Sequence, residues 1–201
     1  MAKGAAYVLL GREGSGKRAV VRCLLGRLRP QQGSVRVLGV DPRRNRWALR
    51  KRVRYVPPEE VYEAPRGAAP ELIVREGSDA GGIPQGVTAI LVTSQAPLIA
   101  AADRVGFLKE GRLLREEDVA SLAARFRRIR YVNEMTEARA DYGNELDAFE
   151  AVRVRVRGWG VDAVVSNFDD AAFETFRAIE GVIDAVAFPM TIEEIFDAVV
   201  G

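Results

Sequence analysis

The chain has 201 residues, of which 48% are hydrophobic and 29% are charged, and its formal net charge is +2. These values are ordinary for a soluble globular protein that can bury one core or two small ones. Histidine is absent, which excludes histidine-dependent catalytic triads and the usual zinc hydrolase sites. The single cysteine, Cys23, excludes an internal disulfide and fits a reducing cytosol. No apolar run approaches the roughly 20 residues needed to span a bilayer.

A glycine-rich turn follows the first predicted strand, the apolar run at 7–10. The turn leads into an apolar helical pattern near 17–28. Its glycines allow backbone N–H groups to converge on an anion, and the N-terminus of the helix adds partial positive charge. An ordinary tight turn with solvated charges is the alternative. The strand, turn and helix together favour a P-loop, whose phosphate-binding residues are Gly11, Gly14, Ser15, Gly16, Lys17 and Arg18.

The last position of this turn departs from the P-loop pattern. A P-loop ends in Ser or Thr, whose hydroxyl coordinates the Mg²⁺ that bridges the terminal phosphates. Arg18 stands at that position, and a guanidinium has no acceptor atom for a metal. The turn therefore predicts a phosphate site without its usual metal ligand.

Strands and helices alternate over the first two thirds of the chain. Further strands are expected at 34–37, 53–56, 71–74, 88–93 and 105–108, and further helices near 44–52, 96–102 and 116–126. This alternation predicts an α/β fold: a mostly parallel sheet with helices on both faces and ligands at the strand ends.

Basic residues are crowded into the segment 43–54. Such a cluster could grip the phosphates of nucleic acid or of anionic lipid. We expect instead the solvated face of a short helix, because no nucleic-acid reader motif accompanies the cluster, and no nucleic acid is expected as a partner. The cluster consists of Arg43, Arg44, Arg46, Arg50, Lys51, Arg52 and Arg54.

The pattern changes beyond residue 126 and predicts a second, smaller α+β domain. Its strands are expected at 128–132, 152–156, 162–165 and 182–188, and its helices near 169–179 and at the end of the chain. The Val/Arg alternation at 152–156 favours a half-buried strand with a solvated arginine face over a basic binding surface. Thr191 and Glu194 form a capping-box pattern for the last helix. The expected domains are 1–118 and 131–201, joined by a connecting helix or linker at 119–130.

The order of these pieces resembles the ATP-binding subunit of ABC transporters, particularly exporter subunits with a small C-terminal domain. The turn at 11–18 stands where that family has its Walker A motif. The other segments that carry the resemblance are 26–39 after the Walker A helix, 54–57 before the Q-loop, 88–94 before the switch histidine, 103–105 and 111–112 in the closing strands, and 189–196 at the close of the C-terminal domain.

The departures from the family pattern fall on positions that have chemical roles in it. Pro58 replaces the Q-loop glutamine, Arg75 replaces the Walker B carboxylate, and Gln95 replaces the switch histidine. Glu76 keeps the place of the catalytic base. The helical subdomain with its LSGGQ signature is missing between Pro58 and Pro70.

The resemblance thus implies a degenerate and shortened nucleotide-binding subunit. It would bind ATP, ADP or another phosphate anion weakly, with Mg²⁺ in doubt, and act mainly as a regulatory or partner-binding component of a membrane exporter. Arg18 and Arg75 would either neutralise phosphates or form salt bridges across a disused pocket. One alternative is an active P-loop ATPase that uses Lys17 and Glu76, so enzymatic activity stays open. The other is a structural adaptor or dimerisation protein that binds no nucleotide.

The resemblance also implies partners and a location. The expected partners are an ABC-type membrane permease subunit, an intact ATPase subunit or a second copy of this chain in a homodimer. The expected location is the cytoplasm, at the inner face of the cell membrane through such a partner.

Overall fold

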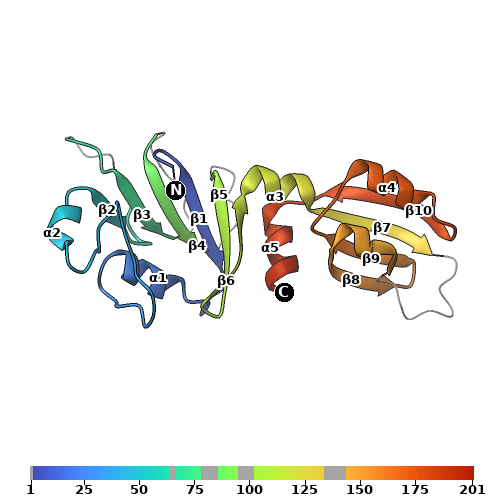
Figure 1. Ribbon diagram of the computed structural model, residues 1–201, viewed down its shortest axis with the longest axis horizontal. Coiled ribbons are helices and arrows are strands. Elements are labelled where there is room, and N and C mark those ends of the chain that lie inside the picture. Colours follow the sequence, from blue (N-terminus) through green and yellow to red (C-terminus); the bar gives the residue numbers. More distant parts are fainter. Residues whose placement is uncertain (1, 64–66, 78–85, 95–101, 134–143) are drawn as a thin grey trace. The chain divides into compact units, whose positions relative to one another are not determined.

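The chain folds into two compact units, Met1–Val119 and Ala120–Gly201 (Figure 1). The computed structural model describes residues 2–63, 67–77, 86–94, 102–133 and 144–201. The first strand of the second unit begins at Arg127, inside the segment 119–130 that the sequence suggests as a connection.

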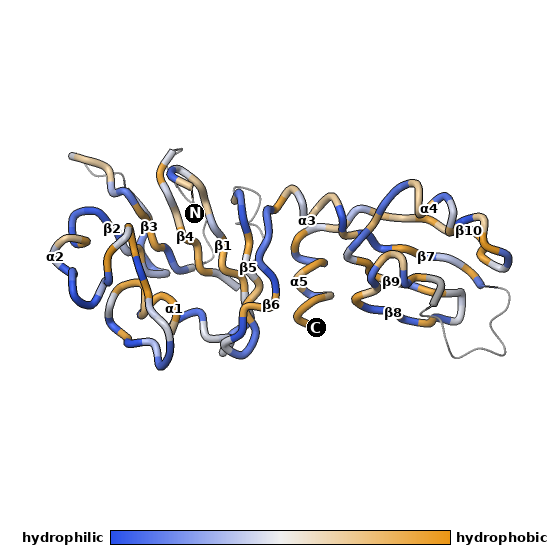
Figure 2. Tube along the Cα trace, in the orientation of Figure 1, coloured by the Kyte–Doolittle hydropathy of each residue, from blue (hydrophilic) through white to orange (hydrophobic). Residues whose placement is uncertain are grey.

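A six-stranded sheet forms the first unit, in the order β2-β3-β4-β1-β5-β6. Neighbouring strands are parallel except for the antiparallel pair β5 and β6, which confirms the expected α/β class with a mostly parallel sheet. Figure 2 shows that β1 is hydrophobic for most of its length, as a strand buried on both faces requires. The elements are β1 (Ala6–Gly11), α1 (Lys17–Leu24), α2 (Arg46–Leu49), β2 (Val53–Val56), β3 (Leu72–Glu76), β4 (Thr88–Thr93), β5 (Arg104–Lys109) and β6 (Arg112–Asp118).

Each face of this sheet has its own apolar cluster. On one face, side chains of β1, β3 and β4 pack with Val21 of α1 and Leu49 of α2. On the other face, Val56, Ile73 and Ala89 pack with Tyr62. The helix expected at 96–102 lies outside the described residues except for residue 102.

Several element expectations for the first unit were wrong. The segment 34–37 makes only an isolated bridge, Val37 to Val40, because Leu38 and Gly39 turn the chain with φ angles of 48° and 84°. The expected helix at 116–126 starts only at Val119, as α3 (Val119–Arg125). The residues before it form β6, a polar edge strand that pairs with β5. Pairing across a sheet edge thus overrides a weak helical pattern.

The second unit contains a four-stranded antiparallel sheet in the order β10-β7-β9-β8. One face of this sheet is packed by aromatic rings, among which Tyr131 and Phe176 meet edge to face at 5.1 Å. The elements are β7 (Arg127–Asn133), the 3-10 turn η2 (Asn144–Phe149), β8 (Ala151–Arg157), β9 (Gly160–Val165), α4 (Asp170–Arg177), β10 (Val182–Pro189) and α5 (Ile192–Val200).

The strand with alternating Val and Arg is exposed on both faces. β8 is an edge strand, and Val152, Val154 and Val156 are 36% to 51% exposed. The expectation of a half-buried strand was therefore wrong, because the apolar core of this sheet is centred on β7 and β9. The capping box at the start of α5 is confirmed, since Thr191 and Glu194 exchange hydrogen bonds.

None of the helices in the described residues is long and apolar enough to span a membrane.

Candidate functional site

The glycine turn between β1 and α1 depends on positions where a side chain does not fit. Gly14 and Gly16 have φ angles of 75° and 103°, which side-chain-bearing residues rarely adopt. At Gly11, an added Cβ would overlap the Ser15 hydroxyl and lie 2.7 Å from the carbonyl oxygen of Leu108. The backbone of this turn, which we call the cradle, is therefore tightly packed.

Polar groups in this cradle lack partners. Lys17 and Arg18 begin α1, and the first backbone N–H groups of a helix have no acceptor within the helix. Ser15 is 5% exposed, and its hydroxyl has no hydrogen-bond partner among the described residues. The tip of the β5–β6 hairpin fixes the turn, because the Gly111 N–H donates to the Ser15 carbonyl at 2.8 Å. An anion at the helix N-terminus would satisfy the free donors.

Lys17 folds back over the turn. Its ammonium donates hydrogen bonds to the carbonyl oxygens of Gly11 and Arg12, the latter at 2.8 Å. Burial lowers the pKa of Lys17, and the nearby Glu13 carboxylate partly opposes that shift. A bound anion would stabilise the charged form of this lysine.

A cleft of about 630 Å³ opens beside the turn, at the carboxyl ends of β3 and β4. We call it the glycine-loop cleft. It brings together five of the six predicted phosphate-binding residues with Pro58, Glu76 and Glu13, whereas its polar residues Thr93 and Ser94 were not predicted as site residues. Their position directly after apolar strands was the available signal for Thr93 and Ser94. The lining residues are Glu13, Gly14, Ser15, Gly16, Lys17, Arg18, Pro58, Glu76, Gly77, Val92, Thr93 and Ser94.

Glu76 is held in place by a tyrosine of the neighbouring strand. The Tyr55 hydroxyl donates to Oε2 of Glu76 at 2.9 Å. Burial raises the pKa of Tyr55, and its hydrogen bond to Glu76 raises it further. The sequence does not predict this hydrogen bond, because the bond depends on β2 and β3 being neighbours in the sheet.

Arg75 lies on the other side of the sheet from Glu76. Successive side chains of a strand point to opposite faces, and Arg75 is aligned with Val56 and Leu91 on the neighbouring strands. Arg75 is 4% exposed and does not border the glycine-loop cleft, whereas Arg18 is exposed at the cleft. The structure thus does not bring the two arginines together. Gln95 lies outside the described residues.

The donors around the cleft fit phosphate. Backbone N–H groups, the Ser15 hydroxyl and Lys17 suit an anion. Arg18 lies in the first turn of α1 and lines the cleft, whereas Arg75, the residue before Glu76, faces the opposite side of the sheet. The described residues contain no group of three or more acidic, histidine or cysteine side chains that could hold a metal ion.

Residues 1–122 match the family model of ABC transporters. The chain is similar to an ATP-binding subunit of an ABC transporter, with 14% identity, coverage of 60% of this chain and 81% of that one, and a TM-score of 0.49. It is also similar to a bacterial Atm1-family ABC exporter with ATP bound, with 16% identity, coverage of 62% and 35%, and a TM-score of 0.49.

A third similar structure is cbiO1 from Clostridium perfringens, described as part of the ABC transporter complex cbiONQ. It shares 14% identity over 59% of this chain and 78% of that chain, with a TM-score of 0.47. No curated protein matches the sequence. The family match covers more than half of the chain, so this protein belongs to the ABC transporter family through its ATP-binding domain.

Proposed function

We propose that this protein is a nucleotide-binding subunit of an ABC-type exporter whose cleft binds phosphate weakly and without Mg²⁺. Its ligand is ATP, ADP or another phosphate anion. Its main role is that of a regulatory or partner-binding component. The observation that carries this proposal is the placement of the two substituted residues: Arg18 stands at the cleft, and Arg75 is buried on the opposite face of the sheet.

The chemistry of the cleft supports binding more than turnover. Phosphoryl transfer depends on positioning and on neutralisation of the charge that develops on the transferred group. The backbone donors at α1, Lys17 and Arg18 can hold and neutralise a phosphate. None of these groups can replace the Ser or Thr hydroxyl that binds Mg²⁺ in a P-loop, so we expect hydrolysis to be very slow.

One observation favours an active ATPase as the second candidate function. Glu76 lines the cleft together with Lys17, and its carboxylate is fixed by Tyr55. A carboxylate held in this way could act as general base toward a water molecule beside a bound phosphate.

Family membership supports a membrane permease subunit or an intact ATPase subunit as the partner. Through such a partner the protein would lie at the cytoplasmic side of the membrane. We retain the division into a nucleotide-binding domain at 1–118 and an accessory domain at 131–201 as part of the proposal.

Calorimetric titration with ATP and with ADP, with Mg²⁺ or with EDTA, tests the proposed function. We expect dissociation constants that differ by less than about threefold between the two conditions, because no residue at α1 binds the metal. Lys17→Ala should weaken binding by about tenfold, through loss of a charge-assisted contact. Lys3→Ala, an exposed lysine away from the cleft, serves as the matched control.

The outcomes separate the candidate functions. Absence of any binding would overturn the proposal and leave the structural adaptor. A Mg²⁺-dependent ATPase rate that both Lys17→Ala and Glu76→Gln abolish would replace it with the active enzyme.

A further inference from the structure

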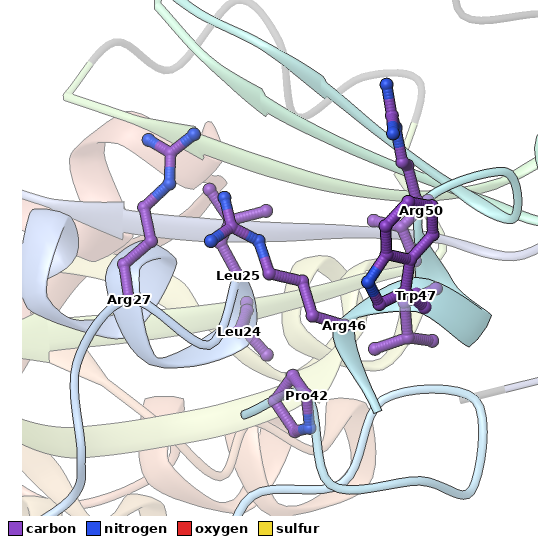
Figure 3. Close-up of a pocket in the computed structure, with 9 residues that line it drawn as sticks. Leu24, Leu25, Arg27, Pro42, Arg46, Trp47 and Arg50 are labelled. Atoms are coloured by element: carbon purple, nitrogen blue, oxygen red, sulfur yellow. The ribbon is translucent and has the colours of Figure 1, made fainter. Parts of the chain in front are cut away.

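A second hollow lies beside the C-terminal end of α1 and beside α2 (Figure 3). Its volume is about 560 Å³, and none of its lining residues borders the glycine-loop cleft. We call it the basic hollow. It is lined by Leu24, Leu25, Arg27, Pro42, Arg46, Trp47, Leu49, Arg50 and Val53.

A glycine turn builds one wall of the basic hollow. Gly26 ends α1 with a φ of 67°, and the N–H groups of Arg27 and Leu28 both donate to the Arg22 carbonyl, at 2.7 Å and 3.0 Å. A Cβ at Gly26 would overlap the carbonyl group of Pro42, so this turn packs directly against the loop that leads to α2. The packing places Arg27 next to α2.

The lining combines an apolar floor with arginine side chains. Figure 3 shows the side chains of Arg27 and Arg46 on either side of Leu25, and that of Arg50 beside Trp47. All three arginines are exposed, and none forms a salt bridge with a described carboxylate. Their cationic groups are therefore available to an anionic partner.

The surrounding sequence strengthens this positive charge. Residues 22–54 contain eleven Lys or Arg residues and a single carboxylate, that of Asp41. Asp41 lies 3.7 Å from Arg44. Among the described residues, Arg43 and Lys51 are exposed next to the hollow without a salt bridge. Arg52 and Arg54 pair with Glu71 and Glu60, and the remaining basic residues still give this segment a positive charge, although the whole chain carries only +2.

The exposed indole of Trp47 lies among these basic residues. Trp47 is 82% exposed, and the Arg50 guanidinium lies 5.5 Å from the centroid of its ring. Indole rings favour the interface between lipid headgroups and acyl chains, because the ring is apolar and its N–H is polar. Clusters of Lys and Arg favour the surface of anionic lipid. The segment around α2 therefore combines a side chain that favours the headgroup interface with side chains that favour anionic lipid.

We propose that α2 and the end of α1 contact an anionic lipid bilayer directly. Arg27, Arg46 and Arg50 bind headgroup phosphates, and Trp47 inserts at the level of the headgroups. The apolar floor and the unstacked face of Trp47 favour lipid over nucleic acid, which shares the phosphate chemistry but offers no acyl chain. This contact is independent of the proposed nucleotide binding and is tested without nucleotide.

Tryptophan fluorescence of the full chain locates the contact. In Trp159→Phe, Trp47 is the remaining tryptophan, and in Trp47→Phe it is Trp159. We expect vesicles with about 30% phosphatidylglycerol in phosphatidylcholine to shift the Trp47 emission to shorter wavelength and to leave the Trp159 emission unchanged. A shift of Trp159 alone, or of neither residue, would overturn the proposal.

Co-sedimentation with the same vesicles tests the charges. Arg46→Ala/Arg50→Ala should reduce the bound fraction at least about tenfold, and Arg155→Ala/Arg157→Ala should leave it unchanged, although both variants lose two charges. Salt at about 0.5 M should release the protein. Equal binding to pure phosphatidylcholine, or equal loss in both variants, would contradict the lipid contact. Binding of a single-stranded oligonucleotide that depends on Arg46 and Arg50, without vesicle binding, would assign the surface to nucleic acid instead.

Discussion

Tyr55 donates a 2.9 Å hydrogen bond from its hydroxyl to Oε2 of Glu76. Arg27 also contacts this tyrosine, because its guanidinium lies 5.5 Å from the centroid of the ring. Glu76 borders the glycine-loop cleft and Arg27 borders the basic hollow. One side chain of β2 therefore contacts a residue of each site.

Removal of the Tyr55 hydroxyl should destabilise the protein modestly. We expect Tyr55→Phe to lower the free energy of unfolding by about 1 kcal/mol, because it deletes one partly buried hydrogen bond to a carboxylate. Tyr62→Phe is the matched control, since the Tyr62 hydroxyl is buried without a hydrogen-bond partner among the described residues. Urea denaturation followed by circular dichroism measures both variants. An equal loss in the two would show that the hydrogen bond to Glu76 adds nothing.

Two glycines of the turn should respond differently to alanine. Gly11→Ala should cost about 2 kcal/mol and remove phosphate binding, because its Cβ would overlap the Ser15 hydroxyl and displace the turn. Gly14→Ala has open space around its Cβ but a φ of 75°, so we expect a cost of about 1 kcal/mol with binding retained. Thermal unfolding and phosphate titration distinguish the two. Retention of phosphate binding by Gly11→Ala would contradict the assignment of the cradle.

Anion binding should weaken as Lys17 loses its proton. Burial lowers the pKa of Lys17, so the ammonium deprotonates at a lower pH than an ordinary lysine. We expect the affinity for inorganic phosphate to fall with rising pH before the usual lysine range, and Lys17→Ala to remove this dependence. Calorimetry over a series of pH values measures it. An affinity that is constant up to the ordinary lysine pKa would contradict a role for this ammonium.

The lowered pKa of Lys17 also affects stability, but stability should rise with pH where anion affinity falls. The unfolded chain binds a proton at Lys17 more tightly than the folded chain does. The contribution of this residue to the free energy of unfolding therefore rises with pH across the window between the lowered folded pKa and the ordinary value.

Asp162 should make the second unit sensitive to acid. Arg128 donates two hydrogen bonds to this carboxylate, at 2.8 Å and 2.5 Å, and these bonds lower the pKa of Asp162. The stabilisation is complete above the unfolded pKa near 4 and is lost as pH falls through the lower folded pKa. At about pH 7, Asp162→Asn should cost about 2 kcal/mol.

The measurement for Asp162 is urea denaturation at several pH values. The difference between the native protein and Asp162→Asn should shrink as the pH falls toward the folded pKa. Asp170→Asn, at an exposed carboxylate in the first turn of α4, is the control. A difference that is independent of pH would show that the ion pair with Arg128 does not stabilise the unit.

The amino-acid sequence by itself determined the local elements and the turn. The apolar runs of β1, β3 and β4 are long enough and bounded sharply enough to be read as buried strands. The spacing of glycines before Lys17 predicts the cradle because only glycine tolerates its φ angles. The capping box at Thr191 is equally local, since its hydrogen bonds join residues three apart.

Only the tertiary structure decided which of these elements meet. Strand order places Tyr55 beside Glu76, and the alternation of side chains along β3 sends Arg75 to the face opposite the cleft. The basic residues near α2 become a lined hollow only because the turn at Gly26 packs against Pro42. β6 and the exposed β8 were misjudged for the same reason: whether a strand pairs, and what covers its faces, depends on residues distant in the chain. Sequence patterns describe neighbours along the backbone, whereas sites are made by neighbours in space.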